Sequence, residues 1–244
     1  LSIIIFFISQ ILFSQNYIPL DTITWSINDT SYKTKKVKGK NALGFKGYIK
    51  LKDYHFKNGT IEFDVLLKEE QSFPGVLYRA RGQDGEQFFM RPHLSGKPDA
   101  NQCAPLMKGI TPWQLMFGPK YSFNIKYDFN NWTHVKLVVN ENRAQVYINN
   151  SDTAQLSWNS IMPIEGGDIM LRGGNTSPFF YANIKVDTTL NEIKNFKTIE
   201  REAIQGLIPE WEVSDMFEEN KLIELSGINQ LIAKRTWQGK IAVE

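Results

Sequence analysis

Apolar residues at every second position, repeated on both sides of a short polar turn, constrain this chain more than any other feature. Apolar residues occupy every second position from Val135 to Val139 and, after the turn at 140–142, from Ala144 to Ile148. A period of two places alternate side chains on opposite faces of a β-strand, whereas a helix spaces its apolar residues three and four apart. Two such runs around a turn rich in Asn predict an antiparallel hairpin. We therefore expect an all-β domain organised around this hairpin.

Further short runs with strand character recur along the chain, and turn residues such as Asn58-Gly59 and Gly166-Gly167 separate them. Short strands at regular spacing are typical of a β-sandwich or a barrel. The other strands that we expect are 22–25, 42–51, 60–67, 76–80, 86–91, 121–127, 154–158, 168–172 and 179–186.

The regular pattern is interrupted between residues 92 and 119, a segment that we call the excursion. It is rich in Gly, Pro, Asn and aromatic residues and has no clean period. Loops of this length in compact domains are usually functional or disordered. Trp113 and Phe117 argue against disorder, because large apolar side chains favour burial. We therefore expect the excursion to be ordered and to line the cleft that carries the function.

The length and charge of the chain limit the number of domains and the kinds of partner that it can have. With 244 residues and a formal net charge of +2, it can hold one large β domain and has no long basic tract of the kind that binds nucleic acid. The only basic cluster, residues 33–40, is interpreted as a solvated loop. Cys103 is the only cysteine, so no disulfide framework is expected.

The two ends of the chain differ in composition from its centre. Residues 1–14 are largely apolar but too short to span a bilayer, which predicts a signal peptide and a secreted or periplasmic protein without a membrane span. The β domain is expected at 17–187. Residues 188–207 are interpreted as a linker or short helix. Residues 208–244 are interpreted as the start of a truncated second domain or as a short mixed C-terminal extension, with further domains possible after Glu244.

Several of these segments together resemble a known group of proteins. The order of the strand segments is similar to that of the concanavalin A-like lectin/glucanase superfamily, including its laminin G-like domains and its bacterial 3-keto-disaccharide hydrolases. The resemblance covers about residues 20–187, and the loop at 91–102 also resembles exported proteins of this fold from Bacteroidetes. The segments that carry it are 59–65 (GTIEFDV), 76–82, 86–90, 132–136 (WTHVK), 144–149 (AQVYIN), 167–171 (GDIML) and 180–186 (FYANIKV).

This resemblance implies a jelly roll of two antiparallel sheets, with a concave face on which members of the superfamily bind or cleave glycans. It implies a carbohydrate, an oligo- or polysaccharide, as the partner. A lectin-like binding module is the first expectation. A glycan-processing hydrolase of the 3-keto-disaccharide type and a protein-adhesion module of laminin G type are the alternatives.

Catalytic carboxylates are the first requirement for a glycosidase, which needs two of them on either side of the scissile bond. Glucanases of the superfamily carry Glu-x-Asp-x-x-Glu on one strand, but the nearest string here, at 62–67, ends in Leu67. Glu62 and Asp64 are therefore expected to face solvent. The remaining catalytic candidates are Glu86, Asp99 and His93, and the absence of a clear pair favours a protein that is not an enzyme.

No pair of histidines has metal-ligand spacing, and no EF-hand pattern is present, so no metal or other cofactor is assigned, although the superfamily leaves a calcium ion possible. The excursion and its flanks instead supply the mixture of aromatic, amide and charged groups that sugar sites use. The alternative is that Trp113 plugs the end of the core and the polar groups satisfy loop backbone. The residues expected to bind ligand are Arg79, Arg91, His93, Ser95, Asp99, Asn101, Gln102, Trp113 and Gln114.

Overall fold

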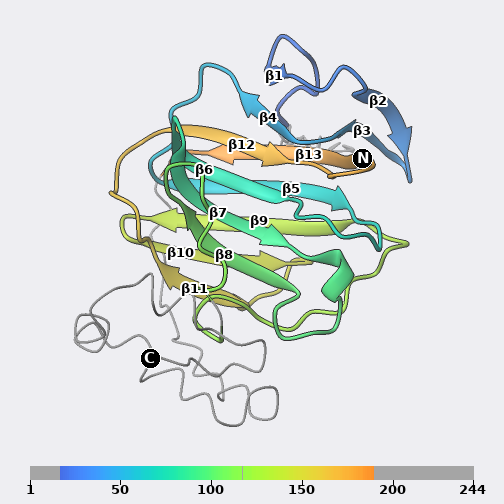
Figure 1. Cartoon of the computed structure of the whole chain (residues 1–244). Helices are drawn as coiled ribbons and strands as arrows, with labels where there is room; N and C mark the ends of the chain where they lie inside the picture. The colour runs from blue at the N-terminus through green and yellow to red at the C-terminus, as the bar shows by residue number, and fades with distance from the viewer. Residues whose placement is uncertain (1–16, 117, 190–244) are drawn as a thin grey trace, which may run out of the picture.

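The computed structural model describes residues 17–116 and 118–189, which form two antiparallel sheets stacked face to face (Figure 1). The predicted segments at 1–14 and 208–244, and nearly all of 188–207, lie outside these residues. The six-stranded sheet has the order β1 (Trp25–Ile27), β4 (Tyr48–Leu51), β12 (Asp168–Arg172), β6 (Gly75–Arg81), β7 (Asp84–Met90) and β8 (Asn101–Leu106). The seven-stranded sheet has the order β11 (Leu156–Asn159), β10 (Arg143–Ile148), β9 (Thr133–Asn140), β5 (Gly59–Leu66), β13 (Phe179–Asp187), β3 (Lys40–Phe45) and β2 (Lys33–Val37).

This architecture is the predicted jelly-roll sandwich, and the predicted hairpin is confirmed as β9 and β10. Val139 pairs with Ala144 and Leu137 with Val146 across the hairpin, and all four side chains are buried. The turn contains Glu141 at a φ of 49°, the left-handed conformation that tight hairpins require. In the part of the chain that the structure describes, no helix is long and apolar enough to cross a bilayer.

The opening strand begins at Trp25 rather than at Thr22, because residues 22–24 form a turn. Four further details of the predicted strand pattern are wrong. Residues 42–51 form two strands in different sheets rather than one, because the chain turns at Gly47, whose φ is 66°. The basic cluster at 33–40 is mostly edge strand β2 rather than a loop. Its exposed Lys side chains disfavour the pairing of another strand with this edge. Residues 101–106, inside the predicted irregular excursion, form β8. The fourth error is the strand predicted at 121–127, where the chain is irregular.

The 121–127 segment nevertheless follows the edge of the six-stranded sheet. The N–H of Cys103 donates to the carbonyl of Tyr121 over 2.8 Å, and the N–H of Gly96 donates to the carbonyl of Ile125 over 2.8 Å. These bonds are scattered rather than arranged as a ladder. The segment therefore covers the edge strand β8 without extending the sheet.

The core between the sheets is aromatic, and Tyr181 on β13 ties the two sheets together. Its ring stacks on Phe45 at 5.2 Å and contacts Phe63 at 5.4 Å between centroids. Its hydroxyl accepts a hydrogen bond from the N–H of Gly75 over 3.0 Å and donates to the carbonyl of Arg172, both of which belong to the opposite sheet. A buried phenol with both hydrogen bonds satisfied fixes the alignment of the two layers.

Candidate functional site

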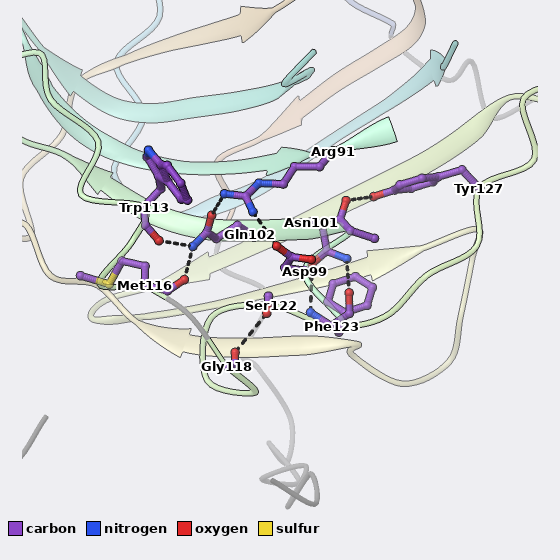
Figure 2. Close-up of polar contacts among 11 residues, drawn as sticks. Arg91, Asp99, Asn101, Gln102, Trp113, Met116, Gly118, Ser122, Phe123 and Tyr127 are labelled. Atoms are coloured by element: carbon purple, nitrogen blue, oxygen red, sulfur yellow. Dashed lines mark hydrogen bonds and ion pairs between the residues drawn. The ribbon is translucent and has the colours of Figure 1, made fainter. Parts of the chain in front are cut away.

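Arg91 is the centre of the polar network that the excursion builds on the six-stranded sheet. It follows β7 directly and precedes the short 3-10 helix η1 (Pro92–Leu94). Its guanidinium donates to the carboxylate of Asp99 over 3.0 Å and to the side-chain oxygen of Gln102, as Figure 2 shows. Arg91 is only 5% exposed, and the ion pair with Asp99 compensates its buried charge.

Gln102 on β8 connects this ion pair to the backbone of the excursion. Its amide nitrogen donates to the carbonyl of Trp113 over 2.7 Å and to the carbonyl of Met116. Its amide oxygen accepts from Arg91, so a single buried amide is bonded at both of its polar atoms. The turn that carries Trp113 is therefore fixed by side-chain bonds rather than by a strand ladder.

The indole of Trp113 lies beside the guanidinium of Arg91, which is 5.3 Å from the ring centroid (Figure 2). This cation–π contact adds to the hydrogen bond that Gln102 makes to the Trp113 carbonyl. Trp113 is nevertheless 40% exposed. It does not plug the end of the core, and it presents a rigid apolar surface to solvent.

Further aromatic and cationic side chains continue from Trp113 along the outer face of the six-stranded sheet, and we call this set the aromatic–cationic row. Arg91 also lies 5.6 Å from the ring of Phe89, and Phe89 contacts Phe73 at 5.9 Å. Arg172 lies 5.0 Å from the ring of Phe73 and 5.4 Å from that of Tyr48. The members of the row are Tyr48, Arg172, Phe73, Phe89, Arg91 and Trp113.

Sequence reasoning missed four members of this row: Tyr48, Phe73, Phe89 and Arg172. The signal for Arg172 was present, because Ile169 and Leu171 are buried and the alternate residues of β12 therefore face outward. Phe73 lies outside any strand and carries no periodic signal.

Two other residues of the excursion that were predicted to bind ligand instead form hydrogen bonds with backbone groups. Asn101 donates from its amide to the carbonyl of Phe123 over 2.8 Å, and its oxygen accepts from the N–H of the same residue. The hydroxyl of Ser95 accepts from the N–H of Tyr127 over 2.9 Å. These two side chains fasten the 121–127 segment to the sheet. Gln114 is exposed beside Trp113.

Arg91 follows one end of β7, whereas Arg79 and Glu86 lie near the opposite end of β6 and β7. Both side chains form hydrogen bonds with the backbone of neighbouring loops. Arg79, with a φ of 51°, donates to the carbonyls of Lys57 and Glu141, each over 2.7 Å. Both N–H groups of Ile161 and Met162 donate to Oε1 of Glu86 over 2.5 and 2.7 Å. Glu86 is 1% exposed, so its carboxylate has no contact with solvent.

The electrostatics of these groups follow from burial and from their partners. Burial lowers the pKa of Arg91, and Asp99 opposes that effect. Burial raises the pKa of Glu86 above its usual value, although the two N–H donors oppose the rise. Burial and the nearby charge of Arg91 lower the pKa of His93, which keeps this imidazole neutral at pH 7. His93 lies edge-on to Phe73, with 5.6 Å between ring centroids.

The structure thus brings together four of the predicted ligand-binding residues: Arg91, Asp99, Gln102 and Trp113. A cavity of about 600 Å³ lies instead on the seven-stranded sheet, and the excursion supplies none of its described lining residues. Among the described residues, no three His, Cys, Asp or Glu side chains are grouped to hold a metal ion.

The fold and this surface define a class, the concanavalin A-like jelly roll of lectins and glucanases. Residues 20–187 match the family of 3-keto-alpha-glucoside-1,2-lyase-like domains, and the chain belongs to that family. No curated protein matches the chain.

Solved structures support the same fold. The carbohydrate-binding module CBM66 from Bacillus subtilis is similar at 13% identity and a TM-score of 0.50, over 67% of this chain and 95% of that one. A protein of unknown function with a galectin-like fold, also from Bacillus subtilis, is similar at 11% identity and a TM-score of 0.53, over 71% of this chain and 94% of that one. At these identities the likeness establishes the fold.

Proposed function

We propose that residues 17–187 form a carbohydrate-binding, lectin-like module that places a saccharide on the outer face of the six-stranded sheet, against Trp113. The observation that carries this proposal is an aromatic ring that is both exposed and fixed. Trp113 is 40% exposed, yet Arg91 stacks beside its ring and Gln102 bonds its carbonyl. A ring held in place binds the apolar face of a pyranose with little loss of conformational entropy.

A carboxylate bonded to the same guanidinium offers an acceptor for a sugar hydroxyl. The side chain of Asp99 is 25% exposed while it is bonded to Arg91, so its carboxylate retains capacity to accept a bond from a hydroxyl group. The aromatic–cationic row continues from Trp113 to Tyr48, which is 36% exposed. Phe89 and Arg91 within it are only 4% and 5% exposed, so the row offers exposed rings at its two ends.

Two further observations support the proposal. A similarly folded Bacillus subtilis protein is named a carbohydrate-binding module, and this chain covers 95% of it. The apolar residues 1–14 support an exported protein, secreted or periplasmic. Export places such a module where polysaccharides occur outside the cytoplasm.

The test is affinity electrophoresis of the full chain through gels that contain soluble starch, xylan, mixed-linkage glucan or fructan. At least one polysaccharide should retard the protein, and Trp113→Ala should weaken that binding about tenfold, because aromatic contacts of this kind contribute on the order of 1 kcal/mol or more. Ile110→Ala is the matched control, since Ile110 is an apolar residue of the same excursion and is 69% exposed. Equal retardation of Trp113→Ala and the wild type would overturn the proposal.

A second candidate function is turnover of a 3-keto saccharide, and family membership is the observation that favours it. His93 lies beside the row, and burial and the charge of Arg91 keep its imidazole neutral, as a proton acceptor requires, although its Nδ1 is buried. Glu86 is excluded from contact with substrate by its burial. Release of the leaving group from 3-keto-glucosides that is lost in His93→Gln but retained in Glu86→Gln would establish the enzyme, and no turnover in the wild type would rule it out for those substrates.

A further inference from the structure

A cavity of about 600 Å³ opens on the outer face of the seven-stranded sheet, on the opposite side of the sandwich from the aromatic–cationic row. Its lining side chains come from four adjacent strands, β9, β5, β13 and β3, and from the loops beside them. The volume falls in the range of about 300–1,000 Å³ that small-molecule sites occupy.

Asp64 on β5 lies at the base of this cavity. It was predicted to face solvent, and that prediction is wrong, because the residue is only 4% exposed. Its Oδ1 lies 2.8 Å from Nδ1 of His134, and its Oδ2 lies 2.7 Å from Nζ of Lys40 and 2.6 Å from the amide nitrogen of Asn183. Burial alone would raise the pKa of Asp64, but these three hydrogen bonds together lower it below the usual value. The carboxylate is therefore ionised at neutral pH.

Asn183 is brought to this carboxylate by an irregularity of β13. The register of β13 against β5 shifts between Ala182 and Lys185, and Asn183 has a φ of 50°. A bulge re-aims the side chain it carries, and a left-handed residue other than Gly costs conformational free energy. The strand thus departs from regular geometry at the position where an amide is directed to Asp64.

His134 is oriented by the same carboxylate. An ionised Asp64 accepts a hydrogen bond, so Nδ1 of His134 carries a proton. Nε2 lies 3.7 Å from Oε2 of Glu62, which is longer than a hydrogen bond. Nε2 of His134 is therefore left to bond a ligand hydroxyl, which can donate or accept.

The rest of the wall combines aromatic, amide and charged groups. Trp132 and Tyr17 line the cavity, with Nζ of Lys40 5.4 Å from the Trp132 ring and Nζ of Lys185 5.0 Å from the Tyr17 ring. The consecutive amides of Asn149 and Asn150 lie on left-handed backbone, and the side-chain oxygen of Asn149 accepts from the N–H of His134 over 3.0 Å. Rings, amides and ammonium groups together fit a ligand that has apolar faces and many hydroxyl groups.

The geometry points to a second saccharide site in this cavity, in which Nε2 of His134, oriented by Asp64, forms a hydrogen bond with a sugar hydroxyl. The amides of Asn149 and Asn150 bond neighbouring hydroxyls, and Trp132 contacts the apolar face of the ring. This site goes beyond the proposed function, which places saccharide at Trp113. The domain would then hold glycan on both outer faces, and two sites that engage one polysaccharide would raise the apparent affinity.

The test uses the full chain in the Trp113→Ala background, so that the first site does not contribute. Cellobiose, maltose, lactose and sucrose are titrated while the ring nitrogens of the histidines are followed by ¹⁵N NMR. In the free protein His134 should show the form with its proton on Nδ1. At least one disaccharide should then shift the His134 Nε2 signal in a saturable manner while the His55 and His93 signals stay in place.

Asn150→Gly removes one amide of the site and suits the left-handed backbone of that position, so the turn is preserved. It should weaken the His134 response about tenfold. Asn142→Gly is the matched control, because it removes an exposed amide from the turn between β9 and β10, which does not line the cavity, and it should leave the response unchanged.

An unchanged His134 signal with all four sugars, or an equal effect of Asn150→Gly and Asn142→Gly, would overturn the second site. Neither result bears on Trp113, which the gel experiment tests on the opposite face. If instead Trp113→Ala binds polysaccharide as the wild type does and Asn150→Gly does not, saccharide does not bind at Trp113. The cavity is then the site that binds it.

Discussion

Gln102 on β8 donates a hydrogen bond to the backbone carbonyl of Trp113 over 2.7 Å, so a buried amide of the sheet determines where an exposed ring of the excursion lies. The same amide accepts from Arg91. A ligand surface on a long loop is thereby given the rigidity of the strands beneath it.

Replacement of Gln102 by Leu should loosen this part of the excursion. The substitution leaves the carbonyls of Trp113 and Met116 and the guanidinium of Arg91 without their partner, which costs about 1–3 kcal/mol of the free energy of unfolding. Urea denaturation measures the loss, and hydrogen exchange of the amides in 111–116 should become faster. Ile110→Ala, an exposed change in the same excursion, should have little effect on either quantity. Exchange as slow in Gln102→Leu as in the wild type would contradict this account.

Asp64 should make the stability of the fold depend on acid pH. Its hydrogen bonds with His134, Lys40 and Asn183 lower its folded pKa below the ordinary value of 3.8. A carboxyl with a lower pKa in the folded state stabilises the fold above the unfolded pKa, and this stabilisation is lost as the pH falls through the folded pKa. The free energy of unfolding of the wild type should therefore fall below about pH 4 more steeply than that of Asp64→Asn.

Urea denaturation between pH 2 and pH 7 measures this difference. At pH 7 Asp64→Asn should be less stable than the wild type by about 1–3 kcal/mol, because Lys40 and His134 lose a charged acceptor. Asp152→Asn, at an exposed position, serves as the control. Parallel pH curves for Asp64→Asn and the wild type would show that Asp64 contributes no acid-dependent stability.

Glu86 should prove to be a structural residue rather than an acid or base that acts on substrate. Burial raises its folded pKa above 4.5, so ionisation of Glu86 weakens the fold as the pH rises through that pKa. Glu86→Gln keeps an oxygen for the N–H groups of Ile161 and Met162 and should be as stable as the wild type at pH 7 or more stable.

Glu86→Ala is the companion variant. It leaves both N–H groups without an acceptor and should cost about 2–4 kcal/mol in thermal or urea unfolding. Polysaccharide binding by Glu86→Gln should equal that of the wild type. A large loss of binding in a folded Glu86→Gln protein would refute the structural role.

The sheets could be predicted where burial and a period of two coincide. The inward side chains of β9 and β10 are apolar and the outward ones are mostly polar, so the hairpin was evident from Val135 to Ile148. The same reasoning failed for β2, whose residues 33–36 are all exposed. It also failed at 121–127, where apolar residues alternate but the neighbouring backbone is contacted only at isolated points.

Part of the site could also be predicted, but from the composition of the excursion rather than from periodicity. The composition of the excursion pointed to Arg91, Asp99, Gln102 and Trp113, and the structure brings these four together. Alternation along β5 gave the correct face for Asp64 but the wrong burial. Its partners Lys40, His134 and Asn183 come from three other strands, and a single sequence does not reveal contacts so distant along the chain.

The most direct test of the central claim is an NMR titration of the full chain with oligosaccharides of whichever polysaccharide retards it in the gel. The indole N–H signal of Trp113, assigned by its loss in Trp113→Ala, should shift to saturation along with backbone signals at Gln102 and Tyr48. Saturable shifts confined to other parts of the domain, with the Trp113 indole signal unmoved, would contradict the placement of saccharide on the outer face of the six-stranded sheet.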